Sequence, residues 1–261
     1  MSSVVSPSLS ASPQRVAARS AISAHDVRKS YRVGNEDVEI LHGVSLDIGY
    51  GEMVAVMGPS GSGKSTLLYC LAGLEQPSQG GVEVAGQHLH QLNRTQLAVM
   101  RRSQVGFVFQ SYNLIPTLTA AENVALPYTL GHRKPEAGLV ERTLAAVGLS
   151  ERAGARPPSM SGGEQQRVAL ARVLAQQPEV IFADEPTGAL DTRTGQMVLG
   201  ELRRIAHDPS RCVLVVTHDP AVAAACDRVL FMRDGLLVQE LRGADADSVA
   251  ATLAALGRQD A

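Results

Sequence analysis

The chain of 261 residues has no long apolar run and no strong excess of one charge. No segment approaches the roughly 18–20 apolar residues that a helix needs to cross a bilayer. Residues 1–20 lack the apolar core of a secretory signal and are rich in Ser and Ala, so we expect a disordered tail there. If the protein acts at a membrane, another chain must supply the membrane part. The net charge of −2 argues against nucleic acid as a partner.

Cysteine is scarce as well, and its spacing does not match that of a metal site. Cys70, Cys212 and Cys226 are far apart and form no C-x-x-C pair. This spacing argues against a disulfide framework or a zinc site and fits a reducing cytosol. Cys70 and Cys212 lie in apolar surroundings, where we expect them to be buried small hydrophobes.

The composition is that of a soluble globular protein, with 44% apolar and 19% charged residues, and the chain is long enough to bury a sizeable core. We predict one folded domain over residues 21–245 and a C-terminal helix and tail over 246–261. Residues 53–57 and 105–109 are predicted to be short buried core strands. Two continuous apolar runs, residues 180–183 and 212–216, are typical of strands buried on both faces of a parallel sheet.

Shorter patterns predict the remaining elements. Alternating residues indicate a hairpin with its turn at residues 34–37, a strand pair over 80–90 and a terminal hairpin that turns at Asp234–Gly235. Residues 119–156 are mostly helical in pattern, with breaks at Pro127 and near Pro135, which suggests a helical lobe inserted into an α/β core. Further helices are expected over residues 65–72, 164–176 and 246–256.

Residues 58–66 form the most specific motif, a phosphate-binding loop of the form G-x-x-x-x-G-K-[ST]. A predicted buried strand precedes the loop and a predicted helix follows it, as the motif requires. Its glycines let backbone N–H groups point into one concavity, and the helix start adds roughly half a unit of positive charge. Lys64 should reach the β- and γ-phosphates of a nucleoside triphosphate, Ser65 should ligate Mg²⁺ and Thr66 should support a phosphate oxygen. The predicted ligand-binding residues of this loop are Gly58, Pro59, Ser60, Gly61, Ser62, Gly63, Lys64, Ser65 and Thr66.

An acid pair, Asp184–Glu185, follows the apolar run at residues 180–183. The carboxyl end of a buried strand is where α/β sheets bind ligands. Asp184 suits the metal shell through a water, and Glu185 suits polarising the attacking water. The alternative, a charge pair at a helix N-terminus, loses weight because a phosphate loop lies upstream in the same chain.

Ser161, Gly162 and Gly163 open the helix predicted over residues 164–176. Serine is a good N-cap, and two glycines allow close backbone approach to an anion. The alternative is an ordinary capping box between Ser161 and Glu164. The position of this peptide upstream of Asp184 favours a ligand-binding role.

With these motifs in this order, residues 22–240 resemble the ATP-binding cassette (ABC) ATPases. The resemblance implies an α/β fold: a phosphate-loop (RecA-like) core, an antiparallel β subdomain and an inserted helical subdomain at about residues 111–163. Met160 stands where the family usually has Leu, a mild departure because the two side chains have similar volumes. The resemblance also implies ATP and Mg²⁺ as ligands. Further site residues implied by it are Tyr31 stacked on adenine, Gln110 linking the metal and γ-phosphate to the helical lobe, Asp191 at a dimer interface, and His218 on the γ-phosphate.

The same resemblance implies a head-to-tail dimer of two copies on ATP. Ser161, Gly162, Gly163 and Glu164 would then be a signature peptide that completes the partner's ATP site. Residues 57–68, 106–110, 113–124 and 183–188 look like the MacB/LolD-type branch of the family, which powers macrolide exporters and lipoprotein-releasing systems.

That branch implies a separate permease of the MacB/FtsX-like type, contacting about residues 110–127, and a place on the cytoplasmic face of the membrane. Export or mechanotransmission of macrolide, peptide or lipoprotein is expected, and the cargo itself is not encoded in these motifs.

Two alternatives belong to other classes. A soluble ABC ATPase acting on nucleic acid, ribosomes or an assembly scaffold is disfavoured, because the chain has no long coiled-coil or zinc insertion and only one cassette. A nucleotide-binding module without catalysis is disfavoured because the catalytic positions, Lys64, Glu185 and His218, are all filled.

Overall fold

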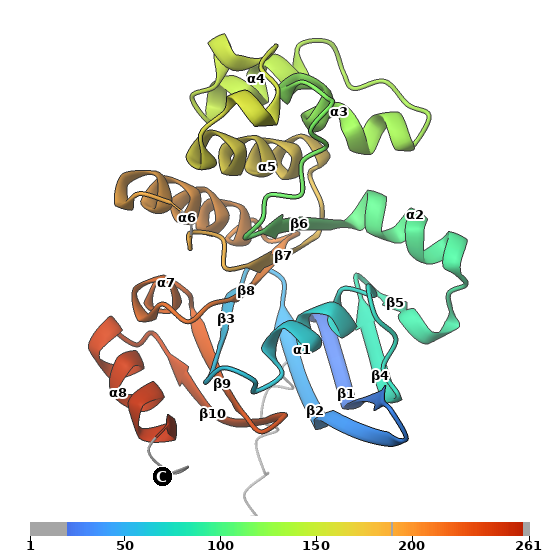
Figure 1. Cartoon of the computed structure of the whole chain (residues 1–261), viewed down its shortest axis with the longest axis vertical. Coiled ribbons are helices and arrows are strands. Elements are labelled where there is room, and N and C mark those ends of the chain that lie inside the picture. The colour runs from blue at the N-terminus through green and yellow to red at the C-terminus, as the bar shows by residue number, and fades with distance from the viewer. Residues whose placement is uncertain (1–19, 189, 258–261) are drawn as a thin grey trace, which may run out of the picture.

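The computed structural model describes residues 20–188 and 190–257 (Figure 1). The tail predicted over residues 1–20 lies outside the described residues except for Ser20, which begins the first strand. The predicted α/β class is confirmed, with one mixed sheet, one antiparallel sheet and a group of helices. The strands are β1 (Ser20–Val33), β2 (Glu36–Gly49), β3 (Met53–Met57), β4 (Gln79–Val84), β5 (Gln87–His88), β6 (Val105–Phe109), β7 (Val180–Asp184), β8 (Cys212–Val216), β9 (Arg228–Arg233) and β10 (Leu236–Arg242). The α-helices are α1 (Lys64–Leu71), α2 (Arg94–Gln104), α3 (Ala120–Leu130), α4 (Leu139–Ala146), α5 (Gly162–Gln176), α6 (Thr192–Ala206), α7 (Pro220–Ala224) and α8 (Ala246–Gly257).

The larger sheet has the strand order β10-β9-β3-β8-β7-β6. All of its pairs are parallel except the edge hairpin β9–β10, which turns at Asp234 and Gly235 as predicted. Its central strands are buried on both faces, which explains why they are uniformly apolar and do not alternate. Val213 and Val215 of β8 face one core, whereas Leu214 and Val216 face the other.

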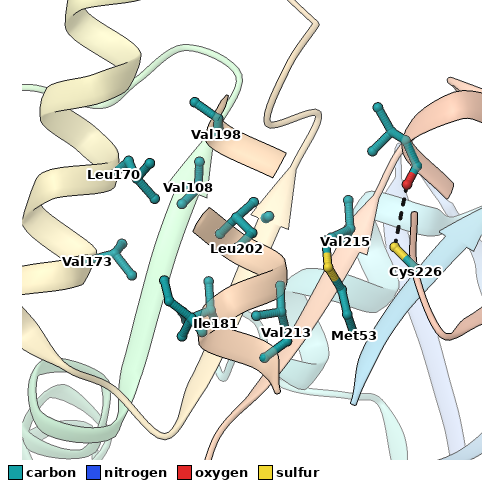
Figure 2. Packing of buried hydrophobic residues seen from close by; sticks show 14 of the residues in the cluster. Met53, Val108, Leu170, Val173, Ile181, Val198, Leu202, Val213, Val215 and Cys226 are labelled. Atoms are coloured by element: carbon teal, nitrogen blue, oxygen red, sulfur yellow. Dashed lines mark hydrogen bonds between the residues drawn. The ribbon is translucent and has the colours of Figure 1, made fainter. Parts of the chain in front are cut away.

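The first core lies between this sheet and helices α5 and α6. Figure 2 shows Leu170 and Val173 of α5 and Val198 and Leu202 of α6 packed toward Ile181 and Val213 of the sheet. The second core joins the opposite face of the sheet to α1 and to the antiparallel sheet. The phosphate loop therefore follows a strand, β3, whose two faces pack against the two cores.

The antiparallel sheet has the order β2-β1-β4-β5. Val33 pairs with Glu36, so the hairpin loop is only Gly34 and Asn35, two residues shorter than the predicted turn. Gly34 adopts a positive φ of 63°, which glycine tolerates in such a tight turn.

Helices α3, α4 and α5 form the upper part of the molecule in Figure 1. The predicted break at Pro127 is wrong, because Pro127 lies inside α3. A capping box between Thr119 and Glu122 fixes the start of the helix, and the helix ends only three residues after the proline. The hydroxyl of Tyr128, the next residue, donates to the Ala175 carbonyl of α5 at 2.7 Å. This hydrogen bond between α3 and α5 helps to offset the stability lost because Pro127 has no backbone N–H to donate within the helix. The break predicted near Pro135 is present between α3 and α4.

All three cysteines are buried and free. Burial raises the pKa of the Cys70 thiol to about 11 and the pKa values of Cys212 and Cys226 to about 12. They are packing residues, as predicted for Cys70 and Cys212. Within residues 20–188 and 190–257, no helix has the length and apolar character needed to span a membrane.

Candidate nucleotide site

The register of the large sheet brings the segments that follow four of its strands to one edge, and several predicted site residues lie in these segments. Val56 of β3 pairs with Val216 of β8, Val216 pairs with Asp184 of β7, and Asp184 pairs with Phe109 of β6. These strands are parallel, so the residues that follow each of them leave the sheet at the same edge. The residues concerned are Gly58, Gln110, Glu185, Thr217 and His218.

The backbone conformation and close packing of the phosphate loop explain its glycines. Gly61 and Gly63 have φ values of 83° and 95°, in the left-handed region that favours glycine. A Cβ on Gly58 would lie 2.1 Å from the Met232 carbonyl oxygen of β9, so this position requires glycine.

Helix α1 starts without a side-chain cap, whereas α2, α3 and α5 each have a capping box. The first N–H groups of α1 thus lack a side-chain acceptor. Together with the positive end of the helix dipole they form a place for an anion.

The Lys64 ammonium group lies inside the loop, where it donates to the carbonyl oxygens of Gly58 at 2.9 Å and Pro59 at 2.8 Å. Burial lowers the pKa of Lys64, and the negative charges of Glu185 and Asp184 oppose that shift. The Lys64 ammonium group and the acid pair therefore interact electrostatically in this structure.

Asp184 ends strand β7 and is half-buried. Burial and then the neighbouring Glu185 charge raise its pKa, whereas Lys64 lowers it. Ser65, Gln110 and Asp184 offer only oxygen ligands, which suit Mg²⁺ better than softer metals. The described part of the chain holds no cluster of three or more His, Cys, Asp or Glu side chains able to bind a metal ion. That finding is compatible with Mg²⁺, which takes few protein ligands and completes its shell with phosphates and water.

Glu185 has a φ of 47°, an unusual value for a residue that is not glycine, and its carboxylate is held by several donors. Its Oε1 accepts the His218 backbone N–H at 3.0 Å and lies 2.7 Å from His218 Nδ1. Its Oε2 accepts the Thr217 hydroxyl at 3.1 Å. Thr217 is only 1% exposed, and its oxygen also accepts the Asp219 N–H. The two residues that follow β8, Thr217 and His218, therefore hold the Glu185 carboxylate in place. Nothing in the sequence indicated this role for Thr217.

Tyr31 lies on the antiparallel sheet, where its hydroxyl donates to the Glu75 carboxylate. The Lys29 ammonium group lies over its ring, 4.8 Å from the centroid, and forms an ion pair with Glu75 at 3.2 Å. Burial, and then the bond to Glu75, raise the pKa of Tyr31 to about 12, and the Thr66 hydroxyl acts in the opposite direction. Tyr31 is thus close to the end of the phosphate loop, and its stacking on adenine stays a prediction.

Ser161 caps α5 in a capping box with Glu164, the alternative that the sequence left open. The Glu164 carboxylate accepts the Ser161 N–H with Oε2 and forms an ion pair with Arg152 through Oε1 at 2.9 Å, so both of its oxygens have partners within the chain. The Ser161 hydroxyl proton and the N–H groups of Gly162 and Gly163 remain available to an anion. The capping box and an anion site are thus compatible.

The serine–glycine segment does not join the phosphate loop within one chain. Among the described residues, no hydrogen bond or ion pair connects Ser161 with Lys64, Asp184 or Glu185. In Figure 1, α5 lies in the upper part of the molecule and α1 in the lower part. Asp191 caps α6, where its carboxylate accepts the Thr194 N–H. Gln110 lines a cavity with Asp184, and its side chain is close to Gly188.

Comparisons with known proteins identify the family. The ABC transporter family profile matches residues 41–188. The macrolide export ATP-binding/permease protein MacB of Shigella sonnei strain Ss046 is 47% identical over 216 residues, which cover 82% of this chain and 33% of that protein. MacB of Escherichia coli strain K12 is 46% identical over the same coverage. The chain thus spans about a third of the length of these curated relatives.

A solved structure matches almost throughout. The ATP-binding cassette MJ0796, in a dimeric post-hydrolysis state bound to ADP and Pi, superposes with a TM-score of 0.80 at 39% identity, covering 85% of this chain and 99% of that one. The fold and the site define a phosphate-loop nucleoside triphosphatase with an inserted helical subdomain. The chain belongs to the ABC transporter family and is one of its ATP-binding, ATP-hydrolysing cassettes.

Proposed function

We propose that two copies of this chain bind two ATP molecules, each between the phosphate loop of one copy and the serine–glycine segment of the other, and that the resulting closure drives a membrane permease. The observation that carries this proposal is the separation described above. Each copy has the phosphate loop and, at Ser161, the start of α5, and among the described residues no hydrogen bond or ion pair joins Ser161 to Lys64, Asp184 or Glu185. Head-to-tail pairing by two-fold symmetry would join them twice.

The roles within one site follow from the contacts. Lys64 would leave the carbonyl oxygens of its own loop for the phosphates, because a charged partner binds more strongly than a neutral one. Ser65, Gln110 and Asp184 would hold Mg²⁺, which when bound neutralises charge on the β- and γ-phosphates.

Two further side chains would act on the reacting groups. Glu185 would accept a hydrogen bond from the attacking water. His218, whose Nδ1 lies 2.7 Å from Glu185 Oε1, would contact the γ-phosphate. ATP favours the closed dimer only if it binds that form more tightly than the open one, and hydrolysis removes this preference.

A cleft beside the site supports a permease as the partner. It has a volume of about 350 Å³ and lies between α2, α3, α5 and β6, next to the segment at residues 110–127 predicted to contact the permease. Apolar side chains line it, and three guanidinium groups add positive charge without a carboxylate partner among the described residues. Arg101 donates to the Gly73 carbonyl, Arg102 to Leu130 and Arg172 to Asn113. The cleft thus fits a short amphipathic cytoplasmic segment with an acidic residue, and this would place the cassette at the inner face of the membrane.

The relatives favour export. MacB is named as a macrolide export ATP-binding/permease protein, and we propose that this cassette serves a permease of the MacB/FtsX-like type. A four-span permease with a large extracytoplasmic domain is the expected partner. A six-span permease with a binding protein would instead indicate import, and co-sedimentation with ribosomes would favour the soluble alternative.

The permease interface is tested by co-expression and affinity capture. Leu130 on the rim of the cleft is 60% exposed, so Leu130→Glu should fold while placing a negative charge against the acidic segment. We expect at least a tenfold loss of captured permease, about 1.4 kcal/mol. Val33, at the tip of the β1–β2 hairpin, is 62% exposed and lies outside the cleft, so Val33→Glu is the matched control. Equal capture by both variants would rule out this cleft.

A further inference from the structure

Gln166 connects the two functional segments of each chain. It lies on α5, five positions after Ser161, and is 1% exposed. Its Nε2 donates to the Pro186 carbonyl at 2.8 Å, and Pro186 directly follows Glu185. A buried side chain on the helix that begins with the serine–glycine segment thus bonds to the backbone beside the predicted base.

A contribution to stability alone does not explain the hydrogen bond between Gln166 and Pro186. Two buried side-chain atoms in the described part of the chain lack a hydrogen-bond partner, and they are Gln166 Oε1 and the Nε of the neighbouring Arg167. An unsatisfied buried atom is unfavourable, and a methionine would fill the same volume without one. Unsatisfied polar atoms in a native structure call for a functional explanation, and here both lie on the same turn of α5.

The segments on either side of the bond between Gln166 and Pro186 are packed against neighbouring elements. Gly163 of α5 is close to Thr194 of α6, where a Cβ would lie 3.6 Å from the Thr194 methyl carbon. The Glu185 N–H donates to the Val216 carbonyl, which fixes the other side of the same segment. A shift of the start of α5 relative to β8 would therefore act on the segment at residues 185–186, which is held by β8 on one side and by Gln166 on the other.

We infer that Gln166 is a positioning residue that couples the two ATP sites of the dimer, a step that rests on the proposed function. In that dimer, Ser161 of one chain faces the ATP of its partner, whereas Glu185 of the same chain acts on its own ATP. Binding at the partner's site moves α5, and Gln166 passes the movement to Glu185. The coupling makes hydrolysis cooperative in ATP.

The test is the ATP dependence of hydrolysis by the purified full chain. For two coupled sites the Hill coefficient of the unmodified protein should lie between about 1.5 and 2, since it cannot exceed the number of sites. Gln166→Met removes the amide, and Gln166→Glu keeps the shape but replaces the donor with an acceptor. We expect both variants to hydrolyse ATP with a Hill coefficient of about 1.

Tyr128→Phe is the matched control, because it removes one side-chain hydrogen bond to a carbonyl at the other end of α5. It should keep the cooperativity, and its melting temperature should fall by about as much as that of Gln166→Met, roughly 2–4 °C.

Three results separate the explanations. A cooperative Gln166→Met variant overturns the coupling role and leaves the proposed function intact. Loss of more than about 10 °C in both Gln166 variants, but not in the control, makes Gln166 a structural residue and also overturns the inference. A Hill coefficient near 1 in the unmodified protein, with no dimer on ATP, contradicts the proposed function itself.

Discussion

Replacing Glu185 with glutamine separates binding from catalysis, because the structure lets the new side chain keep the old contacts. The amide oxygen of the substituted side chain can accept the His218 N–H as the carboxylate does. Its amide nitrogen then faces the Thr217 hydroxyl, whose oxygen can serve as an acceptor. We therefore expect Glu185→Gln to fold and to bind ATP normally.

The rate should fall steeply in that variant. A positioned general base contributes about 10²–10⁴-fold to the rate, which corresponds to about 3–5 kcal/mol in the barrier. ATP should persist in the closed form, so dimers should accumulate. Phosphate release measures the rate, and light scattering after size exclusion measures the dimer. Hydrolysis within about threefold of the unmodified rate would refute the assignment of Glu185 as the base.

The remaining predictions concern the phosphate loop, its neighbours and the thiols. Lys64→Ala should weaken ATP binding at least tenfold by equilibrium titration, because it removes the charge-assisted contact with the phosphates; unchanged affinity would exclude Lys64 from the site. Thr217→Val should lower kcat by about 10–100-fold with KM little changed, since a hydrogen bond to a charged group contributes about 1.5–3 kcal/mol, and Thr217→Ser should restore the rate. Gly235 has a φ of 71°, and a Cβ there would lie 2.2 Å from the Ile40 carbonyl oxygen. Gly235→Ala should therefore destabilise the fold by more than about 2 kcal/mol in a urea titration. Ellman's reagent at pH 8 should leave all three thiols unmodified in the folded protein and label them after unfolding, because their raised pKa values keep them protonated below about pH 11; fast labelling of the folded protein would contradict their burial.

Much of the fold could be predicted because its signals are local. Buried parallel strands are continuous apolar runs, and the phosphate loop is a contiguous peptide between a strand and a helix. Pro127 misled the prediction because tertiary contacts, such as that of Tyr128 with α5, outweigh the cost of proline in a helix. Helices α2 and α6 went unpredicted although each carries a signal. Asn93 and Gln96 form a capping box, and Val198, Leu202 and Ile205 have helical spacing.

The site was only partly predictable, because its supporting contacts join distant parts of the chain. Thr217 reaches Glu185 across two neighbouring strands, and its neighbours in the sequence give no hint of that contact. Gln166 meets Pro186 only because α5 packs beside the segment that follows β7. Glu75, which lies between α1 and β4, meets Lys29 and Tyr31 of β1 only in the folded chain. Such pairings are set by the register and packing of the folded chain and not by any local pattern.

A complementation assay with two inactive variants tests the shared site most directly. Lys64→Ala disables the phosphate loop. Gly162→Asp places a negative charge at the serine–glycine segment. The first turn of α5 tolerates an acidic side chain, but that charge would repel a phosphate bound there. A mixed dimer retains one intact site, formed by the loop of one variant and the helix start of the other.

We predict that each variant alone is inactive and that an equal mixture recovers up to about a quarter of the unmodified ATPase rate. A mixture as inactive as its components, although both variants fold and pair, would contradict a nucleotide shared between two subunits.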